Sequence, residues 1–223
     1  MSIYTEPAPL PSHHPDNFQN REVHTIPELV KKAGYDALTE SRNRHWLDDN
    51  LPRILEQNHS NVALLSVDID GLKEKNDTEG HAEGDDLLVG AVIGMRRAGK
   101  ELDTLRQDST ERPSDIVVAR VGGDEFNVVL FGIENDEQLE VVTNKVRSEL
   151  EAEGVSASIG GVVHNGEDAQ ELKALADKKM YDEKAIHKQE RFNAELAKLS
   201  RVKRIAAKLG IWMLNKAGIK QPR

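Results

Sequence analysis

Apolar residues recur at two different spacings along this chain, and the alternation of the two predicts its elements. Residues 61–69 are almost continuously apolar and end in acids, which predicts a buried strand that reaches a polar edge. The apolar runs 116–121 and 126–133 flank a Gly-Gly-Asp-Glu turn and therefore predict a β-hairpin. A further strand is expected over residues 155–163.

Helical spacing of apolar residues is found between these strands. It predicts helices over residues 84–105 and 136–151, and another from about residue 168. A helix is also expected around residues 46–55, although Pro52 removes one amide from its hydrogen bonds. Strands and helices that mix in this way, with one antiparallel hairpin, indicate an α/β or α+β layer fold.

The ends of the chain differ from its middle. Residues 1–24 carry four prolines and no apolar periodicity, which predicts an extended lead-in. The sequence Thr-Ile-Pro-Glu at 25–28 has the form of a capping box with proline in the first turn, so a short helix is expected from there to about Gly34. We divide the chain into an N-terminal extension (1–33), a central domain (34–190) and a C-terminal basic helix (191–223).

Charge and residue types narrow the classes of function. The 223 residues include 30 Lys and Arg and 39 Asp and Glu, and the resulting charge of −9 disfavours nonspecific binding to nucleic acid. The absence of cysteine excludes disulfides, thiolate nucleophiles and zinc–thiolate sites, so any metal must bind oxygen or imidazole ligands. No apolar run approaches the ~18 residues of a membrane span, and the N-terminus lacks the pattern of a signal peptide. We therefore expect a cytoplasmic protein without an integral membrane segment or a nucleic-acid partner.

The C-terminal segment has the opposite charge. Residues 190–223 contain nine Lys or Arg and two Glu, a net +7, whereas the 21 basic and 37 acidic residues of 1–189 give −16. One helical face of this segment is apolar: Phe192, Leu196, Leu199, Val202, Ala206, Leu209 and Met213. Three roles are open for it: to pack on its own domain, which we expect first, to build a helical dimer, or to lie on an anionic membrane surface.

Four acidic residues stand where predicted strands meet a turn. Asp68 and Asp70 end the strand at 61–69, and Asp124 and Glu125 follow the two hairpin glycines. If the two strands are neighbours, these acids converge on one sheet edge. Carboxylate oxygens from two elements suit Mg²⁺, which keeps positions for water and substrate phosphate. The alternative is that each acid is an ordinary solvated residue.

Five ordered motifs resemble the GGDEF domain of diguanylate cyclases, over roughly residues 34–190. The hairpin turn contains Gly-Gly-Asp-Glu-Phe, the sequence that names the family, at 122–126. Residues 36–44 (DALTESRNR) are similar to its D-x-L-T-x-x-x-N-R motif, and residues 68–85 to its D-I-D-x-x-K-x-x-N-D-x-x-G-H-x-x-G-D stretch. Residues 158–160 (SIG) and 176–181 (ADKKMY) resemble its closing motifs. The resemblance implies a central, mostly antiparallel sheet with flanking helices, the nucleotidyl-cyclase or ferredoxin-like palm.

The same resemblance implies a metal site and a catalytic residue. Asp68, the backbone carbonyl of Ile69 and Asp124 would hold Mg²⁺, with Mn²⁺ as an expected substitute. Asp124 would also accept the proton of the substrate 3′-hydroxyl.

It further implies a binding site for the nucleotide. Asn76 and Asp85 would read guanine, because a carboxylate accepts hydrogen bonds from N1–H and N2–H₂ of that base. The other implied contacts are the backbone N–H groups of Gly71 and Leu72, the side chain of His81, and the cations Lys73, Lys184 and Lys188 at the phosphates. Plainer alternatives exist: a turn at Asn76, a helix start at His81, and a solvated helix face for Lys184 and Lys188.

The implied reaction condenses two GTP molecules into cyclic di-GMP and two pyrophosphates. One site supplies one nucleotide, so a homodimer is expected for catalysis, with a regulatory protein as a possible further partner. Two alternatives differ in class or substrate: an inactive GGDEF module that binds nucleotide and signals through contacts, and a cyclase that also uses adenine nucleotides. The intact Asp68, Asp124, Asn76 and Asp85 argue against the first, and Asp85 favours guanine.

Three positions depart from the family pattern. Lys75 stands where the family is usually apolar, Gly71 where it is usually bulky, and Lys188 where arginine is common, so the bidentate fork is lost there. An R-x-x-D sequence at Arg112 and Asp115 has the form of the family's inhibitory product site. Six residues separate its Asp115 from the first hairpin glycine where five is usual, so whether it binds cyclic di-GMP is left open.

Overall fold

Five strands form one sheet in the computed structural model, which describes residues 29, 33–58, 61–105 and 116–216. The strand order is β1-β3-β4-β2-β5; β1 runs parallel to β3, and the other neighbours are antiparallel. The strands are β1 (Arg42–Asn43), β2 (Val62–Ile69), β3 (Ile116–Arg120), β4 (Glu125–Phe131) and β5 (Ala157–Val163). The mostly antiparallel sheet and the hairpin of β3 and β4 are confirmed.

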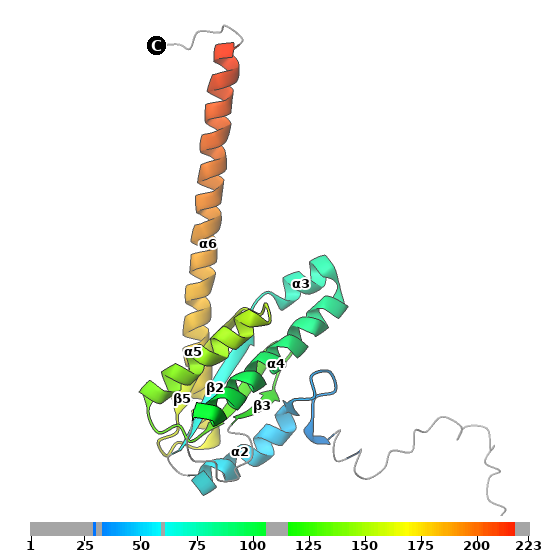
Figure 1. The fold of residues 1–223 in the computed structure, drawn as a ribbon, viewed down its shortest axis with the longest axis vertical. Helices are drawn as coiled ribbons and strands as arrows, with labels where there is room; N and C mark the ends of the chain where they lie inside the picture. Colours follow the sequence, from blue (N-terminus) through cyan, green and yellow to red (C-terminus); the bar gives the residue numbers. More distant parts are fainter. Residues whose placement is uncertain (1–28, 30–32, 59–60, 106–115, 217–223) are drawn as a thin grey trace, which may run out of the picture.

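Helices cover both faces of this sheet (Figure 1). They are α2 (Arg44–Asn58), α3 (Leu72–Glu79), α4 (His81–Leu105), α5 (Asp136–Ala152) and α6 (Ala169–Lys216). One core cluster joins β2 to α4 and α5, and a second joins β2 to α2 and α6. The fold is therefore α+β, with a three-layer arrangement of helices, sheet and helices.

The central strand β2 explains why its sequence shows no alternation. Ala63, Leu65 and Val67 belong to the core cluster under α4 and α5, while Val62 and Leu64 belong to the cluster under α2 and α6. All eight residues of β2 are buried. A strand that is covered on both faces reads as a continuous apolar run, and its exit into Asp68 brings a carboxylate to the sheet edge.

The last helix corrects one expectation. Residues 191–216 do not form a separate helix that packs on the domain; they continue α6, which extends beyond the sheet as a rod (Figure 1). Every side chain from Lys188 to Lys198 is exposed, and so are Ile205 and Leu209. The reason is length, because 48 helical residues span about 72 Å whereas a seven-residue strand spans about 23 Å.

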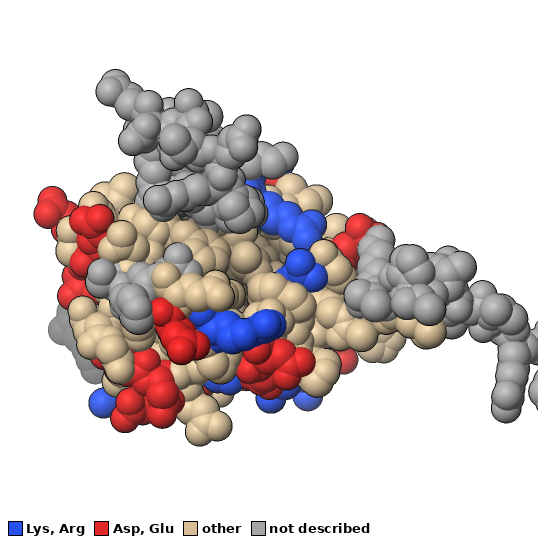
Figure 2. Space-filling view, turned by 90° about the horizontal axis from the view of Figure 1, so that it is seen from below, with Lys and Arg blue, Asp and Glu red and all other residues tan. Residues whose placement is uncertain are grey.

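Several expectations lie outside the described residues. These are the extended lead-in, the capping box at 25–28, and the R-x-x-D residues Arg112 and Asp115. Among the helices that are described, none combines the length and the apolar character needed to cross a membrane. On the face shown in Figure 2, acidic and basic groups are interspersed and no continuous basic area is visible among the coloured residues.

Candidate active site

The end of β2 and the Gly-Gly-Asp-Glu turn lie side by side at one edge of the sheet. In the antiparallel register of β2 and β4, Asp68 is the partner of Glu125. The backbone N–H of Ile69 donates to the carbonyl of Asp124 at 2.9 Å. The two acidic segments, 56 positions apart by residue number for Asp68 and Asp124, are therefore adjacent because their strands are neighbours.

Asp68 is a buried carboxylate that has one satisfied oxygen and one unsatisfied oxygen. Lys184 of α6 donates to Oδ2 at 2.7 Å, and the side chain of Asp68 is 4% exposed. The second oxygen, Oδ1, is buried and accepts no hydrogen bond from the described part of the chain. Burial raises the pKa of Asp68, Lys184 opposes this, and the charges of Asp124 and Asp70 raise the pKa further. The arrangement favours a second cation beside Asp68.

The residues at this edge fit a divalent cation with oxygen ligands. An orphaned carboxylate oxygen next to a second carboxylate, with the carbonyl of Ile69 at the end of the same strand, is a donor set of the kind that Mg²⁺ takes, with water and substrate phosphate as the remaining ligands. No group of three or more His, Cys, Asp or Glu side chains in the described ranges has a metal-binding arrangement. A site of this kind would therefore be completed by the substrate rather than by the protein alone.

The segment after β2 places the expected nucleotide-binding residues around a short helix. Gly71 adopts a left-handed φ of 77° and directly precedes α3, so that the first backbone N–H groups of this helix face the loop. Lys73 is exposed on α3, and His81 and Asp85 are exposed at the start of α4. Lys75, at a position where the family is usually apolar, instead pairs with Glu79 on the same helix at 2.7 Å.

Asn76 lies against the first turn of α4. A Cβ atom added to Gly84 would come within 1.9 Å of the Asn76 Oδ1 atom, so the two residues are in direct contact. The chain reverses between α3 and α4 at Gly80, where φ is 101°. This turn brings Asn76 beside Gly84, the residue that precedes Asp85.

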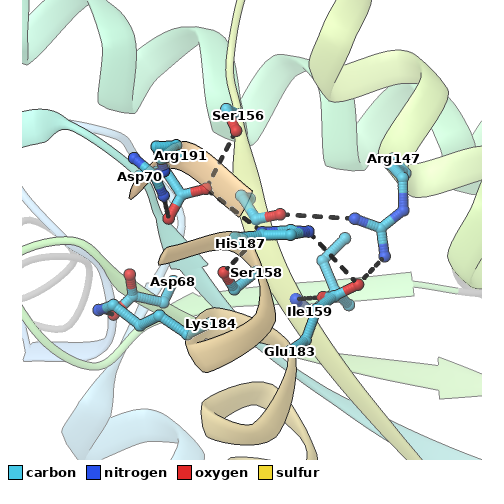
Figure 3. Close-up of polar contacts among 11 residues, drawn as sticks. Asp68, Asp70, Arg147, Ser156, Ser158, Ile159, Glu183, Lys184, His187 and Arg191 are labelled. Atoms are coloured by element: carbon cyan, nitrogen blue, oxygen red, sulfur yellow. Dashed lines mark hydrogen bonds and ion pairs between the residues drawn. The ribbon is translucent and has the colours of Figure 1, made fainter. Parts of the chain in front are cut away.

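The two cations expected at the phosphates lie in different surroundings. Lys184 is held against Asp68, and this contact raises the pKa of Lys184 although burial opposes it. Lys188 lies one turn further along α6 and is exposed. Glu183, on the same turn as Lys184, binds Arg147 of α5 at 2.7 Å and accepts from the N–H of Ile159, and this fixes α6 against α5 and β5 (Figure 3).

Sequence reasoning missed the hydrogen bonds by which Arg120 fixes the Gly-Gly-Asp-Glu turn. Arg120, the last residue of β3, donates through Nε and NH2 to the carbonyl of Gly123, at 3.1 and 2.7 Å. Its NH1 donates to Asp36 at 3.1 Å, and Asp36 also accepts from the backbone N–H and hydroxyl of Thr39. The D-x-L-T motif therefore anchors the turn that carries Asp124. A basic residue two positions before the glycines was the available signal.

The contacts of Asp36 with Thr39 and Arg120 predict how the free energy of unfolding depends on pH. Burial raises the pKa of Asp36, but hydrogen bonds from Thr39 and Arg120 bring it below its ordinary value of 3.8. A carboxyl whose pKa is lowered on folding contributes stability above its unfolded pKa, and this contribution is lost as the pH falls through the folded pKa. We expect Asp36→Ala to lower the free energy of unfolding by about 1 kcal/mol at neutral pH.

Urea unfolding of the parent and of Asp36→Ala at pH 7 and at about pH 3 measures this effect, since the difference between them should shrink in acid. Exposed Asp182 of α6 offers a matched control, and Asp182→Ala should change little at either pH. An Asp36→Ala difference that stays constant with pH would show that the ionised carboxylate is not the stabilising group.

A family model described as "Diguanylate cyclase, GGDEF domain" matches residues 33–190. The bifunctional diguanylate cyclase/cyclic di-GMP phosphodiesterase MucR of Pseudomonas aeruginosa is 32% identical over 170 residues, which is 70% of this chain and 23% of MucR. The probable diguanylate cyclase DgcI of Escherichia coli is 30% identical over 169 residues, 75% of this chain and 35% of DgcI. The chain thus spans about a quarter to a third of the length of these relatives.

Solved structures share this fold. The coiled coil and GGDEF domain of DgcB from Caulobacter crescentus, in complex with c-di-GMP, matches with a TM-score of 0.60 and 24% identity, over 72% of this chain and 85% of the solved chain. Diguanylate cyclase SiaD of Pseudomonas aeruginosa, in complex with its activator SiaC, matches with a TM-score of 0.57 and 26% identity, over 70% of this chain and 61% of the solved chain. The family model covers well over half of the chain, and the chain therefore belongs to the GGDEF domain family of diguanylate cyclases.

Proposed function

We propose that this protein condenses two GTP molecules into cyclic di-GMP and two pyrophosphates. The observation that carries the proposal is the buried Oδ1 of Asp68, which accepts no hydrogen bond from the described residues and lies beside the Asp124 turn. A cation bound there would stabilise the ionised form of this buried carboxylate. Asp68, Asp124 and the carbonyl of Ile69 would hold Mg²⁺, with Mn²⁺ as a substitute. When bound, the metal would stabilise negative charge on the phosphates and assist the attacking hydroxyl.

The chain's own residues supply positioning and charge. Asn76 and Asp85 would bind the guanine edge, and the N–H groups of Gly71 and Leu72 at the start of α3 would bind phosphate oxygens. Lys73, Lys184 and Lys188 would neutralise the triphosphate. Asp124 would take the proton from the 3′-hydroxyl as that oxygen attacks the α-phosphorus, and pyrophosphate leaves with the bonding electron pair. His81 would line the nucleotide site.

The product contains two identical halves, so the proposed reaction needs two sites that face each other. Each site would bind one GTP and activate one 3′-hydroxyl, and a homodimer with antiparallel substrates would join them. Holding both nucleotides in the geometry of attack would account for much of the rate, because proximity and orientation can supply roughly 7–11 kcal/mol of a barrier. A regulatory partner would act by controlling this pairing.

Incubation with nucleotide and metal tests the proposal. The purified chain is given GTP, ATP or both, with Mg²⁺ or with a chelator, and the products are identified by mass spectrometry. Cyclic di-GMP and pyrophosphate from GTP alone, lost with the chelator and in Asp124→Ala, are the expected results. Binding of GTP without product would establish the inactive nucleotide-binding module instead, and mixed products with ATP would establish a cyclase with broader base use.

Gly84→Ala tests the placement of the guanine reader. The new methyl group would occupy the position of the Asn76 amide, 1.9 Å from its Oδ1, so Asn76 must rotate away from the base. We expect the KM for GTP to rise about tenfold, as for one or two lost hydrogen bonds, with little change in stability. Gly90→Ala in the same helix is the control, since its Cβ would meet atoms no closer than 3.7 Å. An unchanged KM for Gly84→Ala would remove Asn76 from base recognition.

A further inference from the structure

Asp70 is a second buried carboxylate at the edge of the site, and its partners come from α6 and from the segment just before β5. Its side chain is 4% exposed. Ser156 donates to Oδ2 at 3.0 Å, the Arg191 NH2 lies 3.0 Å from Oδ1, and the His187 Nδ1 lies 3.7 Å from Oδ2 (Figure 3). We call Asp70, Ser156, His187 and Arg191 the Asp70 cluster.

The contacts in this cluster are unequal in importance. A buried carboxylate is costly unless a charge or several hydrogen bonds compensate it. Arginine is always charged in proteins, whereas histidine carries charge only when it is protonated, so Arg191 is the permanent counter-charge of Asp70. The side chain of Arg191 is itself 56% exposed, and its removal therefore leaves a buried charge unpaired without opening a hole in the core.

Asp70 occupies a sensitive place in the proposed site. It follows the metal-ligand candidates Asp68 and Ile69 and precedes Gly71, which adopts the left-handed conformation and is the N-cap of α3. No residue of α3 is fully buried, and Leu72 at its first position is the one α3 side chain among the hydrophobics that pack against the core, so core packing holds this helix only at its start. The backbone N–H of Asp70 also donates to the carbonyl of Ser156 at 2.8 Å. Asp70 therefore anchors the loop whose N–H groups would bind phosphate.

Arg191 lies on α6 at the point where this helix extends beyond the domain. Leu172, Ala176 and Met180 of this helix are buried against the sheet, whereas side chains from Lys188 onward to Lys198 are exposed. Arg191 lies where the helix leaves the domain, and its guanidinium reaches back to Asp70. The ion pair thus connects the outer part of α6 to the phosphate-binding loop.

We propose that Arg191 is a positioning residue for the nucleotide site and acts through Asp70, by holding the Asp70–Gly71 turn in the conformation that binds magnesium GTP. This inference rests on the proposed function. Arg191 lies outside the five family-like motifs, and neither charge nor spacing singles it out among the basic residues of the C-terminal segment. Its role follows from the contact with a carboxylate two positions after Asp68.

The test compares Arg191→Ala, Arg191→Lys, Asp70→Asn and the double variant Arg191→Ala/Asp70→Asn. The first measurement is the affinity for a non-hydrolysable GTP analogue with Mg²⁺, and the second is amide hydrogen exchange over residues 68–75. Arg191→Ala should weaken binding about tenfold, as expected when an outer partner of a ligand-bearing segment is removed, and should speed exchange in that segment. Arg191→Lys keeps the charge and should recover most of the affinity.

The double variant tests whether Arg191 acts through Asp70, and a surface variant shows the effect of removing an exposed arginine elsewhere. If Arg191 acts through Asp70, the double variant loses no more affinity than the more damaging of the two single variants. Arg201→Ala removes an exposed arginine further along α6 and should match the parent in both measurements. Unfolding midpoints of all variants show whether any loss of affinity follows a general loss of structure.

The outcomes separate this inference from the proposed function. A parent that binds the analogue, combined with unchanged affinity and exchange in Arg191→Ala, overturns the role of Arg191 alone. Fully additive losses for Arg191→Ala and Asp70→Asn overturn the coupling through Asp70. A parent that binds the analogue but forms no cyclic di-GMP contradicts the proposed reaction and leaves the comparison of variants valid. A parent that binds no analogue contradicts both.

Discussion

Asp68→Asn is expected to abolish formation of cyclic di-GMP and at the same time to make the protein harder to unfold. The loss of activity follows from the loss of a proposed metal ligand, because the charge stabilisation that a bound metal supplies is worth several kcal/mol, so we expect a decrease of at least about 100-fold. The gain in stability follows from burial. The side chain is 4% exposed and one of its oxygens has no hydrogen-bond partner among the described residues.

The direction of the stability change follows from the pKa of Asp68. Burial raises it above the ordinary value of 3.8, and the contact with Lys184 does not reverse this. A carboxyl whose pKa rises on folding destabilises the folded state as the pH rises above its unfolded pKa, and this effect is complete above its folded pKa, because the folded state disfavours the ionised form. Asparagine carries no charge to bury. Lys184 keeps access to water, since 40% of its side chain is exposed, and it need not remain unpaired in the interior.

Thermal unfolding and product assays on the same preparations measure both effects. The excess stability of Asp68→Asn over the parent should be full at pH 7 and should decrease as the pH is lowered through the folded pKa of Asp68 towards 3.8. Asp182→Asn, which changes an exposed acid of α6, serves as the control and should alter neither property. A lower midpoint for Asp68→Asn would mean that the ion pair with Lys184 stabilises the fold more than burial of the carboxylate destabilises it.

The elements with buried apolar faces are those that the sequence predicts well. The strand at 61–69, the hairpin and the helices at 84–105 and 136–151 all have clear apolar patterns, and the structure contains each within a few residues. The helix α3 is the counterexample. It has no buried residue, so it has no apolar period to detect, and the family-like D-I-D motif was the available guide to this segment.

Some contacts of the candidate site could be predicted from the sequence, and others could not. Convergence of Asp68 and Asp124 could be stated only on the condition that their strands are neighbours, and the pairing of β2 with β4 meets that condition. The pairs Arg120–Asp36 and Arg191–Asp70 could not be predicted, since each joins residues far apart in the sequence. With 30 basic and 39 acidic residues, pattern alone cannot decide which cation meets which carboxylate. These contacts depend on the tertiary arrangement of the elements.

The long α6 shows a different limit. Its apolar residues beyond Lys188 follow helical spacing as regularly as those that pack on the sheet, so periodicity predicts a helix in both halves. Periodicity does not reveal which half has a sheet beneath it. The exposed Phe192, Leu196, Ile205 and Leu209 leave a helical dimer and a membrane surface as the two remaining roles for this face.

Gly160→Ala is expected to be the most destabilising single methyl group that can be added near the site. Gly160 is the last residue of the S-I-G motif in β5, and α6 lies directly on it. A Cβ at this position would be 2.2 Å from both the carbonyl oxygen of Ala176 and the backbone nitrogen of Met180. These are backbone atoms of a helix, which cannot rotate away, so α6 must move off the sheet. Overpacking of this kind costs about 1–3 kcal/mol, and we expect the upper part of that range.

The same displacement should reach the candidate active site, because α6 carries Lys184 and Arg191 towards Asp68 and Asp70. Urea unfolding of Gly160→Ala gives the loss of stability, and GTP turnover at a temperature where the variant is folded gives the loss of function. Gly90→Ala is the matched control, since a helical glycine with ordinary contacts should become more stable by up to about 1 kcal/mol. If Gly160→Ala unfolds like the parent, β5 and α6 are not in the close contact that positions Lys184 beside Asp68.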